Sequence, residues 1–177
     1  EAVMDYYNAM LAAKENQTVR QHQIAEGKTQ TISGSGIATA EQVMLLNDAG
    51  ELIEFLNVGQ SVHLHIVVRT HAELPELVLG YMIKDRLGQP VFGTNTHHLK
   101  KVLNNVGENS CITFDFEFNA NLGCGTYSVA VALHTADSHI NNNFEWRDMA
   151  LVFHVVSLDQ PDFVGVNWLP PTLIISQ

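Results

Sequence analysis

Residues 112–118 of this chain are Ile-Thr-Phe-Asp-Phe-Glu-Phe, and residues 62–69 are Val-His-Leu-His-Ile-Val-Val-Arg. In both stretches an apolar side chain recurs at every second position, and most residues between them are polar. Successive side chains of a β-strand point to opposite faces of its sheet, so a period of two predicts strands with one buried and one exposed face. The two stretches therefore predict an all-β fold.

Shorter alternating runs, bounded by Gly, Asn or Asp, follow one another after Gly36. Further strands are predicted at Gln42–Leu46, Val78–Lys84, Pro90–Thr94, Thr126–His134 and Met149–Val156. Seven or eight strands without a helical insertion predict an antiparallel β-sandwich. Leu122, Gly125 and Tyr127 resemble a tyrosine corner, in which a Tyr early in a strand hydrogen-bonds back across the preceding turn. This feature favours an immunoglobulin-like topology.

The first 34 residues differ from this pattern. Apolar residues at helical spacing and the lack of a helix breaker predict an N-terminal helix over residues 1–16. The next stretch, residues 17–34, is polar and is predicted to be a linker. We therefore expect residues 1–34 to be a helix and linker from an upstream module, and residues 35–177 to be the sandwich.

The C-terminal tail contains two more β-like runs, Phe163–Trp168 and Thr172–Ser176, separated by Pro170-Pro171. A proline pair cannot take part in a central sheet, so it is expected to hold an extra C-terminal strand away from its own domain. Exchange of this strand between the protomers of a dimer is one hypothesis that the arrangement raises.

The composition is that of an acidic folded protein. Of the 177 residues 46% are hydrophobic, and nine Lys and Arg stand against nineteen Asp and Glu, for a formal net charge of -10. Such a charge repels nucleic-acid phosphates and anionic lipid head groups, so we expect no nucleic-acid partner. No apolar run approaches the ~20 residues that a membrane-spanning helix needs.

Motifs of the common catalytic sites are missing or incomplete. Gly27-Lys28-Thr29 matches the end of a phosphate-binding loop, but His22 stands where the first glycine of that loop belongs. Carboxylates such as Asp115 and Glu117 lie two apart on a predicted strand, which is typical of a solvated face rather than of glycoside hydrolysis. We therefore predict no catalytic residue and no cofactor.

Nine histidines raise the alternative of a metal site. His63 and His65 project from the same face of one predicted strand, and other histidines are candidates to converge with them. Neither is accompanied by an acidic or thiol ligand at a diagnostic spacing, so we expect no metal.

A binding surface is the remaining candidate. If Tyr127 and the alternate residues after it face the core, then Ala132 and His134 face outward on a strand whose outer side chains are mostly very small. We expect a shallow floor there, flanked by outward-facing Met82, Lys84 and His154 on other strands. Trp146 offers the broad apolar ring on which sugar C–H groups stack, although it and Met82 are equally suited to filling an interface or a core edge.

Several short motifs, in order along the chain, resemble the Wzt C-terminal domain, which is attached to the ATP-binding subunit of O-polysaccharide exporters. The resemblance covers residues from about Gly34 to Val156. Its most specific part is Phe92-Gly93-Thr94-Asn95-Thr96, which follows a Lys-Asp-x-x-Gly turn. The other matching segments are Ser35-Gly36-Ile37-Ala38, Leu46-Asn47-Asp48-Ala49-Gly50, Gly80-Tyr81-Met82-Ile83-Lys84-Asp85 and Gly125-Thr126-Tyr127.

The resemblance implies an immunoglobulin-like sandwich that binds the non-reducing end of a lipid-linked O-antigen polysaccharide without catalysis. It implies a cytoplasmic location, peripheral to the inner membrane, with the chain's own upstream ATPase domain, a membrane subunit and a second copy as partners. Residues 1–34 would then be the end and tether of the ATPase module. The alternative is a structural or dimerisation module that binds no glycan. The predicted carbohydrate-binding residues are Met82, Lys84, Asn95, Ala132, His134, Trp146 and His154.

Overall fold

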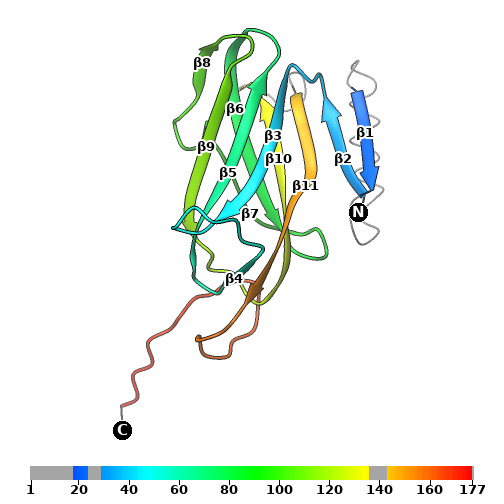
Figure 1. Cartoon of the computed structure of the whole chain (residues 1–177). Coiled ribbons are helices and arrows are strands. Elements are labelled where there is room, and N and C mark those ends of the chain that lie inside the picture. Colours follow the sequence, from blue (N-terminus) through cyan, green and yellow to red (C-terminus); the bar gives the residue numbers. More distant parts are fainter. Residues whose placement is uncertain (1–17, 24–28, 136–142, 177) are drawn as a thin grey trace.

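A computed structural model describes residues 18–23, 29–135 and 143–176, which form an all-β sandwich (Figure 1). In chain order the strands are β1 (Thr18–Gln23), β2 (Thr29–Gly34), β3 (Ala38–Leu46), β4 (Phe55–Asn57), β5 (Ser61–Thr70), β6 (Leu74–Lys84), β7 (Pro90–Asn95), β8 (Leu103–Val106), β9 (Cys111–Asn119), β10 (Gly125–His134) and β11 (Asn143–Val156). The predicted all-β sandwich is confirmed. No helix in the described ranges is long and apolar enough to cross a membrane.

The strands form two sheets. The larger has the order β1-β2-β11-β10-β6-β7, with β4 added to β11 and β8 added to β6, and the smaller has the order β3-β5-β9. The pairings are antiparallel except for that of β4 with β11, which is parallel. The predicted strands thus lie in two layers, with their apolar faces turned toward each other.

The core lies between these layers. Val62, Leu64, Ile66 and Val68 of β5 are all 0% exposed, as their alternation predicts. From the larger sheet Tyr81 reaches across the core, and its ring centroid lies 4.9 Å from that of Phe116 on β9. Burial raises the pKa of the Tyr81 hydroxyl to about 12.

The predicted tyrosine corner is present at the start of β10. The Tyr127 hydroxyl donates a 2.8 Å hydrogen bond to the backbone carbonyl of Gly123, and the side chain is buried. The bond joins the beginning of β10 to the chain just before it, and so fixes where β10 enters the sheet.

The predicted linker over residues 17–34 is wrong, because β1 and β2 occupy most of this stretch. β2 pairs with the edge of β11, where Ser33 lies opposite Trp146 and Ile32 opposite Arg147. Thr31 and Ser33 are buried although they are polar. A strand held by backbone hydrogen bonds needs no apolar alternation, which is why composition alone predicted a linker here. The predicted helix over residues 1–16 lies outside the described residues.

The C-terminal tail packs at first and then leaves the sandwich. The rings of Phe163 and Trp168 lie 4.7 Å apart and pack against the core, and Asn167 forms a β-bridge with Leu122. Beyond Trp168 the chain runs away from the two sheets (Figure 1). The predicted strand Thr172–Ser176 is extended chain without a strand partner among the described residues.

Candidate functional site

Four neighbouring strands of the larger sheet align small residues between a Trp and an Asn. The registers place Trp146 of β11 opposite Ala132 of β10, Ala132 opposite Gly80 of β6, and Gly80 opposite Asn95 of β7. Residues in such a cross-strand row share one face of the sheet. The flanking Leu133 belongs to the core, so this row lies on the opposite, outer face.

A cavity of about 320 Å³ lies over this row. Glycine and alanine form its floor, a thioether and an indole contribute apolar surface, and amide, hydroxyl and imidazole groups contribute polar atoms. The lining residues are Gly80, Tyr81, Met82, Gly93, Thr94, Asn95, His98, Ala130, Ala132, His134 and Trp146.

The two glycines of the floor are needed for space. A Cβ atom on Gly80 would lie 3.3 Å from the Asn95 Cβ and 4.0 Å from the His134 Nε2. A Cβ on Gly93 would lie 3.3 Å from the carbonyl oxygen of Tyr81. Any side chain at these positions would therefore occupy the cavity or push its walls apart.

The polar groups of the cavity are held in defined orientations. The Asn95 side-chain oxygen accepts a 2.7 Å hydrogen bond from the backbone N–H of His98, which fixes the orientation of the amide group. His134 is 3% exposed, and its Nδ1 lies 2.6 Å from the carbonyl oxygen of Thr135. That carbonyl can only accept, so Nδ1 is the donor in this bond.

Lys84 lies at the border of the cavity rather than in its lining. Its ammonium group forms a 2.8 Å ion pair with Asp148 and lies 5.9 Å from the centre of the Trp146 ring. Lys84 is on β6 and Asp148 on β11, so the pair spans β10, where Lys84 lies opposite the small Ser128. The ion pair neutralises both charges beside the cavity, and the Lys84 ammonium makes a cation–π contact with the Trp146 indole.

Trp146 lies within β11, which begins six residues before the predicted strand Met149–Val156. The register between β10 and β11 shifts between Val129 and Val131, and Met149 in this bulge has a left-handed φ of 48°. The Gln30 side chain donates to the Met149 carbonyl at 3.0 Å, which ties the bulge to β2. The bulge interrupts the alternation that marks a strand, so the sequence hid the first half of β11.

Most of the predicted residues meet at one place. Met82, Asn95, Ala132, His134 and Trp146 all line the cavity.

His154 lies elsewhere on the sheet. Its Nδ1 is 3.0 Å from the Thr126 hydroxyl, and its ring stacks on that of Phe55. Three further lining residues, Gly80, Gly93 and His98, were not predicted, although a glycine inside a predicted strand indicates that another group approaches the backbone closely.

The histidines considered as metal ligands are divided between the two sheets, because His63 and His65 lie on β5 whereas His134 and His154 lie on β10 and β11. His63 contacts Asp48 at 3.5 Å, and His65 contacts Asp115 at 2.9 Å, on the smaller sheet. Among residues 18–23, 29–135 and 143–176 no group of three or more His, Cys, Asp or Glu is arranged to hold a metal ion.

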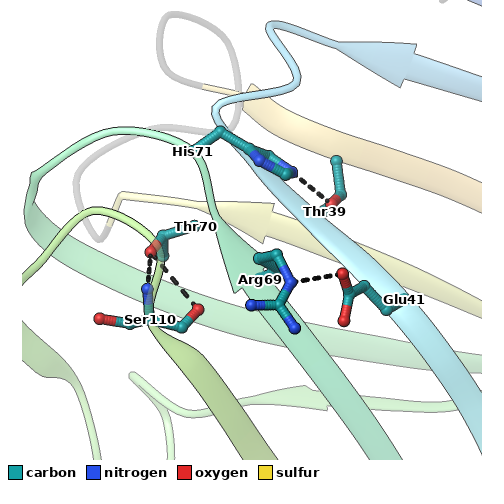
Figure 2. Close-up of polar contacts among 6 residues, drawn as sticks. All are labelled: Thr39, Glu41, Arg69, Thr70, His71 and Ser110. Carbon is teal, nitrogen blue, oxygen red and sulfur yellow. Dashed lines mark hydrogen bonds and ion pairs between the residues drawn. The ribbon is translucent and has the colours of Figure 1, made fainter.

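A second polar cluster lies at one end of β3 and β5 (Figure 2). Glu41 pairs with Arg69, and the Thr39 hydroxyl lies 3.0 Å from the His71 Nε2. The hydrogen bond from the Arg69 guanidinium lowers the pKa of Glu41. Since the partners belong to neighbouring strand ends and satisfy one another, this cluster joins β3 to β5.

Glu145 is a buried carboxylate beside Trp146 in the chain. It is 4% exposed, forms a 2.9 Å ion pair with Arg147 and accepts a 3.4 Å hydrogen bond from the backbone N–H of Ala40 on β3. Burial raises the pKa of Glu145, and Arg147 partly opposes that rise. The residue links the two sheets at their edge and does not line the cavity.

Comparison with known proteins places this fold. The crystal structure of the C-terminal domain of Wzt superposes with a TM-score of 0.74 at 19% identity, covering 89% of this chain and 93% of that one. A Niemann-Pick type C2 protein from the Japanese carpenter ant superposes with a TM-score of 0.49 at 10% identity, covering 70% and 96%, which is too distant to inform function. No curated protein sequence matches the chain.

The model of the Wzt C-terminal domain family matches residues 29–169, well over half of the 177 residues. The match includes β2, which the sequence-based boundary at residue 35 had left out of the domain. It also spans the four strands that form the cavity. The chain therefore belongs to the Wzt C-terminal domain family.

Proposed function

We propose that this chain is a non-catalytic module that recognises the non-reducing end of a lipid-linked O-antigen polysaccharide for export by an ABC transporter. Membership of the Wzt C-terminal domain family supports a transporter-associated, carbohydrate-binding role. The observation that carries the proposal is the row from Trp146 through Ala132 and Gly80 to Asn95, with the cavity above it.

The cavity has the chemistry that a sugar ring requires. An indole face packs against C–H groups, and the small floor lets a ring approach the sheet. Asn95, Thr94 and His98 supply donors and acceptors for hydroxyl groups along one side. The volume of about 320 Å³ is at the lower end of ligand pockets, which span ~300–1,000 Å³. This size suits the end of a chain rather than a long stretch of it.

The lack of charged side chains in the described lining of the cavity favours a neutral ligand and argues against a catalytic role. The lining, within the part of the chain that is described, contains no Asp, Glu, Lys or Arg. The nearby ammonium of Lys84 is already paired with Asp148. Glycoside hydrolysis requires two carboxyl groups that flank the scissile bond, and this lining supplies none.

We further propose that two copies associate through the C-terminal tail. Leu173, Ile174 and Ile175 are 80%, 83% and 76% exposed, which is unfavourable in water. An apolar groove of about 540 Å³ opens between β7 and β9, with Phe92 and Phe116 among its walls. β9 ends the smaller sheet, so the tail of a second copy can add to it as a strand and cover the groove.

In this proposal an upstream ATPase domain and a membrane subunit complete the transporter, which holds the sandwich on the cytoplasmic side of the inner membrane. Two sandwiches per transporter would bind two glycan ends and strengthen a weak single-site affinity.

Calorimetric titration of the chain with O-polysaccharide from the strain that encodes it tests the glycan-binding role. We expect saturable binding that Trp146→Ala weakens at least tenfold. Phe92→Ala is the matched control, because Phe92 is an exposed aromatic residue that lines the other groove. Absence of saturable binding by the unaltered chain, or equal losses in both variants, would contradict the proposal.

A further inference from the structure

An exposed aromatic ring lies beside the end of β11 that is remote from the cavity. Phe55 of β4 is 64% exposed, although its neighbour Leu56 is 1% exposed and belongs to the core. Phe55 therefore points away from the core, onto the outer face of the larger sheet. A large aromatic side chain in this position loses contact with water only if something covers it.

The Phe55 ring is held in place. It stacks on His154 with 4.8 Å between ring centroids and 21° between ring planes. The His154 Nδ1 lies 3.0 Å from the Thr126 hydroxyl, and the backbone N–H of His154 donates a 2.8 Å bond to the Glu54 carbonyl. The imidazole thus stacks on one face of Phe55, and the residue is still 64% exposed. Such a pre-ordered ring loses little side-chain entropy when a ligand stacks on it.

The stacked rings of Phe55 and His154, which we call the platform, share one face of the larger sheet with the cavity. His154 lies opposite Thr126 on β10, and Trp146 lies opposite Ala132 on the same strand. These two positions on β10 are six residues apart in number, a distance of about 20 Å along the strand. Between them the outer face of β10 carries only Ser128 and Ala130. A ligand chain that leaves the cavity along β10 would therefore pass over these small side chains, and over the Lys84–Asp148 ion pair that spans β10 at Ser128, before it reaches Phe55.

We propose that Phe55, supported by His154, is a second carbohydrate subsite, which takes interior sugar residues of the same polysaccharide whose end occupies the cavity. This inference rests on the proposed glycan-binding function. Stacking on an aromatic face requires only the apolar side of a sugar ring, so it tolerates the repeat that happens to lie there. Glu54, exposed beside the platform, offers acceptors for hydroxyl groups. His154 is a positioning residue, because it holds the ring that contacts the sugar.

The test compares short and long glycans on the same protein. The probes are O-polysaccharide fragments of the encoding strain that retain the non-reducing end, separated by size into single repeating units and chains of several repeats. The unaltered chain is expected to bind long fragments at least tenfold more tightly than short ones. Phe55→Ala should abolish this difference by weakening only the binding of long fragments. Thr126→Val, which removes the bond that holds His154, should reduce the difference in part.

Leu52→Ala is the matched control, because Leu52 is 62% exposed and close to Phe55 in the chain. It should leave both affinities unchanged. The subsite is refuted if Phe55→Ala binds long fragments as tightly as the unaltered chain, or if it disturbs only self-association, which would make the platform a protein contact. Failure of the cavity itself is distinguishable, since the unaltered chain would then bind neither size of fragment and Trp146→Ala would change nothing.

Discussion

Individual residues of the outer face determine whether the cavity exists. Gly80 and Ala132 occupy the middle of the row, and any larger side chain there would fill the space between Trp146 and Asn95. The mildest test of this requirement adds a single methyl group to the floor, because that substitution leaves every hydrogen-bonding group of the site in place.

Gly80→Ala is expected to weaken glycan binding roughly tenfold, which corresponds to ~1.4 kcal/mol. The new Cβ would lie 3.3 Å from the Asn95 Cβ and narrow the floor. Gly107→Ala is the control, because a Cβ there meets only the Ser110 hydroxyl at 3.7 Å, on a turn outside the cavity. Calorimetry with O-polysaccharide gives both affinities, and equal affinities for the two variants would contradict the assignment of the floor.

Glu145 makes stability depend on pH in a predictable direction. Its pKa is raised in the folded state, so folding favours the protonated carboxyl. The stability that it contributes is present below the unfolded pKa, near 4.5, and is lost as pH rises through the higher folded pKa. Relative to Glu145→Gln, the unaltered chain should therefore lose stability as pH rises from about 4.5 toward neutrality.

Urea unfolding of both proteins at several pH values measures this difference. Glu41→Gln is the control of opposite sign, because the pKa of Glu41 is lowered by Arg69 and its contribution is lost on acidification. The Glu41 effect is expected to be small, since solvent screens an exposed ion pair. A stability of the unaltered chain, relative to that of Glu145→Gln, that stays constant or increases as pH rises would contradict the assignment.

At the scale of elements, strands with two distinct faces were predictable from sequence. β5 and β9 alternate strictly because one face meets the core and the other meets water. β2 was not predictable, since its buried Thr31 and Ser33 carry no apolar signal. The strands β4 and β8 are too short to show a period, and the bulge at Met149 broke the alternation in β11.

The candidate site was predictable only in part for the same reason. Outward-facing positions follow from alternation within one strand, which identified Met82, Ala132 and His134. Which strands lie side by side depends on long-range pairing that the sequence does not display. His154 was accordingly grouped with the cavity, although its register places it beside Phe55. Glycines were overlooked because they contribute space rather than a functional group.

The boundary of the domain gives a prediction at this scale. A chain that begins at Thr29 retains β2, whereas one that begins at Ser35 exposes the edge of β11 beside Trp146. The shorter chain is expected to be less stable and more prone to aggregate, because an unpaired edge strand pairs with other molecules. Melting temperature and light scattering compare the two. Equal melting temperatures without aggregation would restore the boundary at residue 35.

At the scale of the whole molecule, the sandwich exposes apolar surface at the tail and at the groove between β7 and β9, among other places. Both surfaces are covered if each tail adds to β9 of a second copy. Deleting residues 172–177 should therefore convert a dimer into a monomer in sedimentation equilibrium. Deleting residue 177 alone is the control. A dimer that survives the longer deletion unchanged would contradict the exchange of tails.

We propose that the outer face of β6, β7, β10 and β11 binds the polysaccharide. The decisive measurement is chemical-shift mapping of backbone amides in the isotope-labelled chain, titrated with O-polysaccharide fragments that carry the non-reducing end. We expect the largest changes at Gly80, Gly93, Asn95, Ala132 and Trp146, and no change on the outer face of β3, β5 and β9. Changes confined to the smaller sheet, or to the groove beside Phe116, would contradict it.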